Sequence, residues 1–281
     1  YVMPSLTDVM TADADLARAP GIRTMAAKGA APEDAFVDWL CRMVDNCLEL
    51  GHRVSEWCGH SPVLEEDIAL ANTALDLIGQ TQLWLGLAGE VEGKGRTADN
   101  LAYLRDAAQF RNVLLVERPN GDFGQTLMRQ FLFDAWHMEM LRALQASSDK
   151  RVAEIAAKAA KEVAYHLERS ADLVIRLGDG TEESRARMQK ALNVLWPYTG
   201  ELFLGDAVDE AVVAEGIAPA PESLKAGWDR TVSDVLAEAT LVKPEGTFQH
   251  KGGKQGRHTE SLGFILADMQ FLQRAYPGGT W

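Results

Sequence analysis

An acid and a histidine lie three residues apart inside a largely apolar segment of the chain. Asp134 and His137 belong to residues 127–147, where most other side chains are apolar. Residues three apart share one face of an α-helix, so the carboxylate and the imidazole would lie one above the other. A buried carboxylate needs a metal, a cation or hydrogen-bond donors to compensate its charge. Carboxylate metal-binding helical bundles use acid-x-x-His pairs in this way, which directs attention to the rest of the ligand set.

The number of histidines limits that ligand set. A di-iron carboxylate centre takes a glutamate from each of two helices and an acid-x-x-His pair from each of two others. The chain has six histidines, and only His52 and His137 have an acid three residues before them. The Glu49–His52 pair belongs to a polar stripe opposite an apolar seam, which predicts a solvated face. The stripe consists of Asp45, Glu49, His52 and Glu56.

Three further side chains complete the candidate set. Glu162 and His166 are four residues apart, and His166 lies on an apolar seam, where a hydrogen-bonded core histidine is favoured over a ligand. Asp76 lies at the border of an inward helical face. The candidates for a residual metal site are Asp76, Asp134, His137, Glu162 and His166. Because the second acid-x-x-His pair, Glu49 and His52, is predicted to face solvent, we predict that this chain has no metal centre, no catalytic residue and no bound cofactor.

Apolar residues that recur every three or four positions predict a protein made of helices. The four longest predicted helices span residues 31–58, 63–89, 127–147 and 151–177. Shorter helices are predicted over residues 100–116, 181–195, 221–240 and 259–275. Strand-like alternation and fixed-period repeats are not found. These patterns predict an all-α, ferritin-like four-helix bundle with additional C-terminal helices, in a single domain over residues 33–281.

The predicted helix over residues 63–89 has two apolar faces. Leu64, Ile68 and Leu75 fall on one of them, and Leu70 and Leu77 fall on the other. A helix that is apolar over most of its circumference is usually buried on most sides. We therefore expect this helix to be buried on much of its circumference.

Composition and charge exclude several classes of partner. The 281 residues are 25% charged and 47% hydrophobic, as in ordinary soluble globular proteins. A net charge of -13, from 28 basic and 41 acidic side chains, argues against nucleic acid or an anionic membrane as the main partner. No apolar run approaches the roughly 20 residues of a membrane span, and no signal-like segment begins the chain. A cytoplasmic location is expected.

The composition of the N-terminal residues and the spacing of the cysteines describe how the chain is organised, and they indicate no catalytic or metal site. Residues 1–32 are rich in Ala, Gly, Asp and Thr and do not begin with Met, so we expect an N-terminal extension, either a tag or a flexible arm. Cys41, Cys47 and Cys58 are odd in number and lack metal-finger spacing. They are expected to be small buried hydrophobes in a reducing compartment.

Several long blocks resemble one family. They lie at residues 45–48, 56–60, 70–80, 114–123, 134–137, 195–203, 253–260 and 269–274. With Asp134-Ala-Trp-His137 and Leu195-Trp-Pro-Tyr-Thr-Gly-Glu-Leu-Phe203 among them, the sequence resembles the C subunits of multicomponent phenylacetyl-CoA epoxidases, also called ring 1,2-monooxygenases. The similarity covers about residues 36–281. It leaves the N-terminal extension outside the pattern.

The resemblance implies a structural role in phenylacetate degradation. In that family the C subunit is regarded as non-catalytic and pairs with a related A subunit, which carries the di-iron centre and binds the CoA thioester. The hetero-oligomer also includes small B subunits and a reductase with FAD, an iron–sulfur cluster and NADPH. Exposed aromatic and aliphatic side chains would form the interface, with the seven tryptophans as anchor candidates and core packing as the default for each.

Two alternatives remain open beside this interpretation. The first is an active di-iron oxygenase subunit that uses Asp76, Asp134, His137, Glu162 and His166 as ligands. The second is a binding module in which the Gly-rich loop 243–258 holds phosphate, including the phosphates of CoA, although its composition favours a surface loop or a loop that contacts another subunit. The basic side chains of that loop considered for this role are His250, Lys251, Lys254, Arg257 and His258.

Overall fold

The structure is a computed structural model that describes residues 32–279, so the predicted N-terminal extension falls almost entirely outside the described residues. Its α-helices are α2 (Pro32–Ser55), α3 (Leu64–Glu92), α4 (Ala98–Tyr103), α5 (Phe123–Leu144), α6 (Lys150–Gly178), α7 (Glu182–Leu195), α8 (Ala207–Ala214), α9 (Lys225–Glu238) and α10 (Glu260–Ala275). Short 3-10 helices are η1 (Ala107–Gln109), η2 (Trp196–Tyr198), η3 (Gly200–Phe203), η4 (Pro221–Leu224) and η5 (Gly253–Gln255). No strand occurs between residues 32 and 279, and the predicted all-α class is confirmed.

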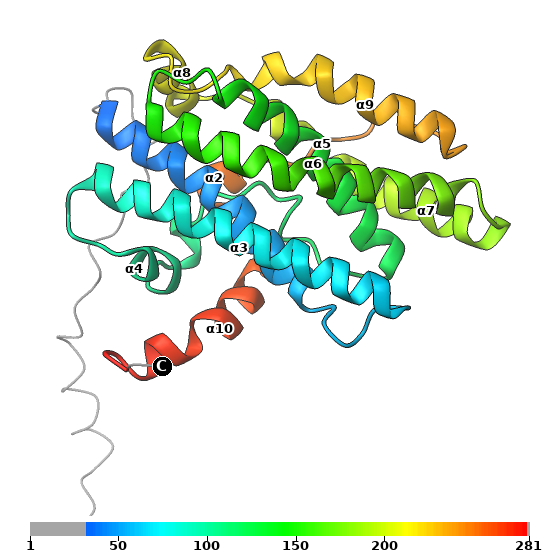
Figure 1. The fold of residues 1–281 in the computed structure, drawn as a ribbon, viewed down its shortest axis with the longest axis horizontal. Coiled ribbons are helices and arrows are strands. Elements are labelled where there is room, and N and C mark those ends of the chain that lie inside the picture. Colours follow the sequence, from blue (N-terminus) through cyan, green and yellow to red (C-terminus); the bar gives the residue numbers. More distant parts are fainter. Residues whose placement is uncertain (1–31, 280–281) are drawn as a thin grey trace, which may run out of the picture.

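Two helical hairpins form the bundle. Helix α2 packs along α3 and α5 along α6, and α3 also contacts α6, so that the four long helices enclose one interior (Figure 1). The hairpins are joined by a long crossover, residues 93–122, in place of a tight turn. Two hairpins joined by one long crossover are the arrangement of ferritin-like bundles. Helices α7 and α9 pack against α5 and α6 and add a further layer.

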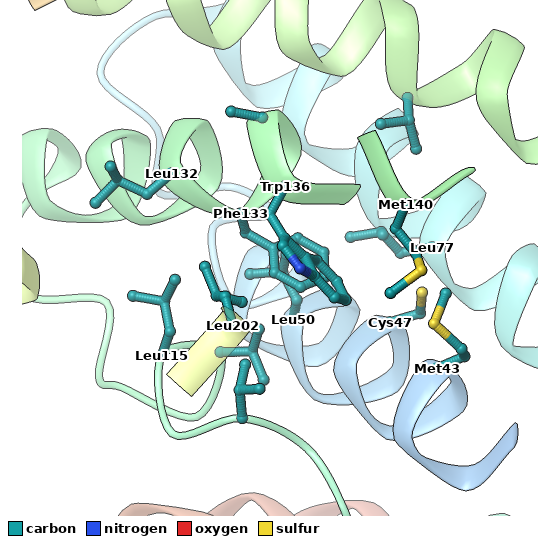
Figure 2. Close-up of a cluster of buried hydrophobic side chains, with 14 of the residues drawn as sticks. Met43, Cys47, Leu50, Leu77, Leu115, Leu132, Phe133, Trp136, Met140 and Leu202 are labelled. Atoms are coloured by element: carbon teal, nitrogen blue, oxygen red, sulfur yellow. The ribbon is translucent and has the colours of Figure 1, made fainter. Parts of the chain in front are cut away.

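Most residues of helix α5, which carries Asp134, are buried. Helix α5 contacts α6, α7 and α9, and most of its apolar residues are buried, on all sides of the helix. Figure 2 shows Leu132, Phe133, Trp136 and Met140 of α5 among buried side chains of other elements, with Cys47 and Leu77 nearby. The interior between the hairpins is therefore mainly filled by hydrophobic packing.

The predicted helix over residues 100–116 is wrong. Helix α4 ends at Tyr103, and after η1 the chain continues without regular structure to Asp122. The backbone N–H groups of Arg111 and Val113 donate to the side chains of Asp45 (2.7 Å) and Asn46 (2.8 Å) on α2. Acceptors on another helix thus replace the carbonyl four residues back, which an α-helix would have used.

The predicted solvated stripe on α2 is also wrong for its first two residues. Asp45 and Glu49 are fully buried, because the crossover covers this side of α2. Asp45 forms an ion pair with Arg105, and Asp38, seven residues earlier, pairs with Arg111 at 2.9 Å. Asp45 and Asp38 of α2 are thus paired with arginines that lie 60 and 73 residues later in the chain, respectively.

One apolar face of α3 is exposed rather than buried. Leu70 and Leu77 are buried as predicted, but the exposed fractions of Leu64, Ile68 and Leu75 are 70%, 53% and 67%. Helix α3 contacts α2, α6 and the short α4, and these contacts leave its third side open. The helix is therefore less buried around its circumference than predicted, because the face with Leu64, Ile68 and Leu75 is exposed.

The tryptophan side chains described in the structure pack in or against the hydrophobic core, and two of the three cysteines are buried there as well. Trp39, Trp84, Trp136, Trp196 and Trp228 are buried and Trp57 is half-buried, whereas Trp281 lies outside the described residues. These six are therefore core side chains. Cys41 and Cys47 are buried as expected, but Cys58 is exposed, so its prediction as a buried hydrophobe is wrong.

Within the described part of the chain, no helix is long and apolar enough to span a bilayer.

Candidate functional site

The carboxylate of Asp134 lies at the centre of the bundle and is held by uncharged donors. The side-chain amide of Gln130, one turn earlier on α5, donates to it at 2.7 Å, and the Ser170 hydroxyl of α6 donates at 2.9 Å. Asp134 has no exposed surface. Burial raises the pKa of Asp134 to about 6, although His166 and the two donors act in the opposite direction. The carboxylate therefore ionises near neutral pH.

His137, three residues later, has different surroundings from Asp134. Its Nε2 atom lies 3.9 Å from Sγ of Cys47 on α2, and its ring lies against Phe133 and Trp136. Its Nδ1 atom is buried and has no hydrogen-bond partner among the described residues. Burial, followed by the charge of His166, lowers the pKa of His137 to about 3. The imidazole is neutral at physiological pH.

The remaining candidates link α6 to α3. His166 is buried, and its Nε2 atom lies 2.9 Å from a carboxylate oxygen of the half-buried Asp76. One turn earlier on α6, Glu162 accepts a 2.9 Å hydrogen bond from the side-chain amide of Gln80. The carbonyl oxygen of the same Gln80 side chain lies 3.9 Å from Sγ of Cys47. The five predicted residues are thus all placed on α3, α5 and α6, but they do not converge on one position.

This donor set does not fit a di-iron centre. Among residues 32–279, no group of three or more His, Cys, Asp or Glu side chains is arranged so that it could hold a metal ion. The partner of Asp134 on α6 is a serine, and Glu162 is paired with a glutamine amide. Two bridged irons need carboxylates and imidazoles that converge on shared positions. The carboxylates here instead accept hydrogen bonds that tie two helices or two turns together.

A second buried polar layer, which the sequence did not reveal, lies between α2, the crossover and the segment that precedes α10. Glu117 accepts hydrogen bonds from the side-chain amide of Asn112 (3.0 Å) and the backbone N–H of Thr259 (2.6 Å), and lies 2.8 Å from Nδ1 of His258. Both carboxylate oxygens of Glu49 are buried without a described partner. The signal for this layer was the set of arginines in the crossover, because buried arginines require acids buried beside them.

Burial makes Glu49 the most perturbed acid of this layer. Burial, and then the charges of Asp45 and Glu117, raise the pKa of Glu49 well above its ordinary value, while Arg105 and Arg53 act in the opposite direction. This environment therefore favours the neutral form of the carboxyl group. Glu49 therefore belongs to the polar layer on the crossover side of α2, and it takes no part in the group around Asp134.

Two helical hairpins, a long crossover and paired acid and imidazole groups at the centre define a ferritin-like carboxylate bundle protein. Residues 10–281 match the family described as "Phenylacetic acid catabolic protein", and the chain belongs to this family. It is similar to the C subunit of the 1,2-phenylacetyl-CoA epoxidase of Escherichia coli (strain K12), with 50% identity over 240 residues. The matched region covers 85% of this chain and 96% of the relative.

The predicted resemblance to C subunits is confirmed by this relative. The family match also begins earlier than predicted. It includes residues 10–32, most of the N-terminal extension that the motif pattern leaves outside the resemblance.

Proposed function

We propose that this chain is a structural, non-catalytic subunit of a cytoplasmic phenylacetyl-CoA epoxidase that acts in aerobic phenylacetate degradation. In this proposal it pairs with a catalytic A subunit that carries the di-iron centre and binds the CoA thioester. The oxygenase also contains a small B subunit, and a reductase with FAD, an iron–sulfur cluster and NADPH supplies electrons. The 50% identity to an epoxidase C subunit supports the choice of complex.

The observation that carries the non-catalytic role is the pairing of the central polar groups. Asp134 is held by Gln130 and Ser170, and Glu162 by Gln80. To bind iron, each carboxylate would have to exchange a hydrogen bond within the protein for a metal bond, and it would leave a buried donor unpaired. The network instead joins α3, α5 and α6, which suits a scaffold whose shape is fixed by polar contacts in its interior.

Iron analysis of the isolated full-length chain tests this proposal. The chain is incubated anaerobically with excess ferrous iron, desalted, and analysed by atomic absorption and by Mössbauer spectroscopy with enriched iron. We expect less than about 0.1 iron per chain, because the paired carboxylates do not converge. In parallel, this chain alone, the A subunit alone and the A subunit with this chain are assayed for epoxide formation. We expect turnover only from preparations that contain the A subunit.

If this chain is instead an active di-iron oxygenase subunit, the iron analysis and the epoxide assay should both give the opposite result. About two irons per chain, with the spectrum of a coupled pair, would favour it. In that case, removal of the Asp134 and His166 side chains would abolish iron binding. Epoxide formation by this chain without the A subunit would overturn the proposed structural role.

A further inference from the structure

A small cavity opens between the segment that follows η3 and the loop that contains η5. Its volume is about 230 Å³. Lys251, Lys254 and Arg257 of the loop line one side. Glu201 and Leu204 line the other side. Pockets for whole small molecules usually measure roughly 300 to 1,000 Å³, so this cavity has room for one charged group of a ligand.

The five basic side chains considered in the sequence do not all face this cavity. His250 stacks on the ring of Tyr198, with 4.5 Å between the ring centroids. His258 lies in the buried polar layer, with its Nδ1 atom beside Glu117 and its Nε2 atom 3.0 Å from the carbonyl oxygen of Phe110. The other three are Lys251, Lys254 and Arg257, and the tertiary structure brings these cations together around one space.

The carboxylates near the cavity already have partners within the protein. The two carboxylate oxygens of Glu201 accept hydrogen bonds from the backbone N–H groups of Leu114 at 2.8 Å and Gly252 at 2.7 Å. Lys254 is buried and donates to the carbonyl of Leu204 at 2.8 Å, with Asp209 at 3.5 Å. Lys251 and Arg257 are exposed and form no ion pair with any carboxylate of residues 32–279. Two cations are thus free to meet an anion at the mouth.

The loop that carries these cations is held in a defined conformation. The backbone N–H groups of Gln255 and Arg257 both donate to the carbonyl of Gly252, at 3.0 and 2.9 Å. Gly252 and Gly256 have positive φ values of 134° and 74°, which residues with a side chain rarely adopt. Gln255 is also anchored to Asp206 at 2.8 Å. The backbone of this loop therefore needs little reorganisation when an anion binds.

We propose that this cavity is a binding site for a phosphate group, with Arg257 and Lys251 contacting its oxygens at the mouth and Lys254 placing positive charge behind them. Arginine and lysine are the usual side-chain partners of phosphate, through charge-assisted hydrogen bonds. A cluster of cations is unusual in a chain of net charge -13, which otherwise repels anions. The phosphate comes either from free inorganic phosphate or from the phosphates of a CoA thioester.

The experiment is a calorimetric titration of the full-length chain with inorganic phosphate at constant ionic strength. The test variant is Lys251→Gln/Arg257→Gln, whose side chains are exposed and do not support the fold. The matched control is Lys158→Gln/Lys161→Gln, two exposed cations on α6 with the same change in charge. We expect saturable binding that is weakened at least about tenfold in the test variant and changed less than about twofold in the control.

Competition with coenzyme A and with 3′-dephospho-coenzyme A identifies the source of the phosphate. Displacement by either nucleotide at far lower concentration than inorganic phosphate assigns the site to that ligand's phosphates, and equal potency assigns it to the free anion. Both outcomes support the site. Non-saturable heats, or equal affinity in the test and control variants, would overturn it. Because binding is measured on the isolated chain, the result is independent of the proposed epoxidase role.

Discussion

At the scale of single residues, the buried acids of this protein differ in the groups that compensate the negative charge of the carboxylate. Asp45 has Arg105 as a charged partner, Asp134 has two uncharged donors, and Glu49 has no described partner. A charge without a partner is costly in a protein interior, so the group shifts its pKa instead. Glu49 and Asp134, whose pKa values are both raised, are therefore each expected to make stability depend on pH.

Glu49→Gln is expected to flatten the dependence of stability on pH. The folded-state pKa of Glu49 is raised, so wild-type stability is greatest below the ordinary pKa of 4.5 and falls as pH rises through the folded-state value. Glutamine does not ionise. We expect the variant to exceed wild type by about 1 to 3 kcal/mol in free energy of unfolding at pH 8 and to match it near pH 4. Urea denaturation at both pH values measures this difference.

The control for Glu49 is Glu154→Gln, an exposed acid on α6 with no described ion pair. Its stability curve should follow that of wild type within about 0.5 kcal/mol at each pH. A Glu49→Gln curve as steep as that of wild type would show that Glu49 is ionised in the folded protein.

Asp134→Ala is expected to lower stability while leaving the function of the assembled complex intact. The substitution leaves the donors of Gln130 and Ser170 unpaired, which costs about 1 to 3 kcal/mol. Because the pKa of Asp134 is raised from 3.8 to about 6, the advantage of wild type is largest below pH 3.8 and shrinks as pH rises through 6. Urea denaturation between pH 4 and 8 measures both effects.

Turnover distinguishes a structural Asp134 from a catalytic one. With complex formation verified by gel filtration, epoxide formation per assembled complex should be unchanged in Asp134→Ala. Glu168→Ala, which removes an exposed acid on the neighbouring helix α6, serves as the control for general effects of charge removal. Loss of turnover in a complex that assembles normally contradicts the structural role.

At the scale of elements, the crossover of residues 93–122 organises one side of the molecule. It docks on α2 through the ion pairs of Arg105 and Arg111, and on η3 through the hydrogen bond from Leu114 to Glu201. The loop around η5 then packs on the crossover, with Gly253 against the backbone of Asn112. Irregular segments are stable here because side chains of regular elements satisfy their backbone groups.

Gly253→Ala is expected to loosen this docking. A Cβ atom at position 253 would overlap the backbone carbonyl oxygen of Asn112, which cannot move without breaking the buried hydrogen bonds of the crossover. We expect a loss of about 1 to 3 kcal/mol in thermal or urea denaturation, as for other overpacked sites. Hydrogen exchange should show faster opening of residues 105–117 than in wild type.

The matched control is Gly263→Ala on α10, where a Cβ atom meets nothing within 4 Å. In a helix interior this change should raise stability by about 0.5 to 1 kcal/mol. A Gly253→Ala protein as stable as wild type would mean that the loop docks less closely than the structure describes.

At the scale of the whole molecule, two helices present apolar side chains to solvent. On α3 these are Ile68 and Leu75, each more than half exposed, and on α10 they are Phe264 and Phe271, with exposed fractions of 67% and 62%. Helix α10 projects from the side of the bundle (Figure 1). Large apolar side chains exposed at helical spacing on one helix often mark a contact with another protein, which agrees with the proposed role as a subunit.

Ile68→Glu/Leu75→Glu is expected to weaken assembly with the catalytic subunit without affecting the isolated chain. Both side chains are exposed, so the free energy of unfolding should change by less than about 0.5 kcal/mol. Burial of two carboxylates in an apolar interface should reduce affinity by at least about tenfold. Co-purification with the tagged catalytic subunit, followed by a calorimetric affinity, measures the effect.

Val242→Glu is the matched control, because Val242 is 73% exposed and lies in the segment after α9. It should leave affinity unchanged. If Phe264→Glu weakens assembly and the α3 variant does not, the catalytic subunit docks on α10 instead of α3.

The amino-acid sequence by itself determined the all-α class, the four long helices and the burial of α5, because helical periodicity and a largely apolar segment indicate burial directly. It also singled out Asp134, His137 and His166, which are buried, but not Gln80 and Gln130, whose side chains pair with Glu162 and Asp134. The short α8, capped by Asp206, was not predicted. Its eight residues are too few to show a clear helical period.

Only the tertiary structure decided which charged residues are buried and which apolar residues are exposed. Asp45 and Glu49 lie on the polar side of the α2 pattern, yet the crossover supplies arginines and covers them. Leu64 and Leu75 lie on an apolar face of α3, yet no described helix covers that side. A periodic pattern records which face of a helix is polar or apolar. Burial depends on what packs against that face, and the packing partners here come from segments distant in sequence.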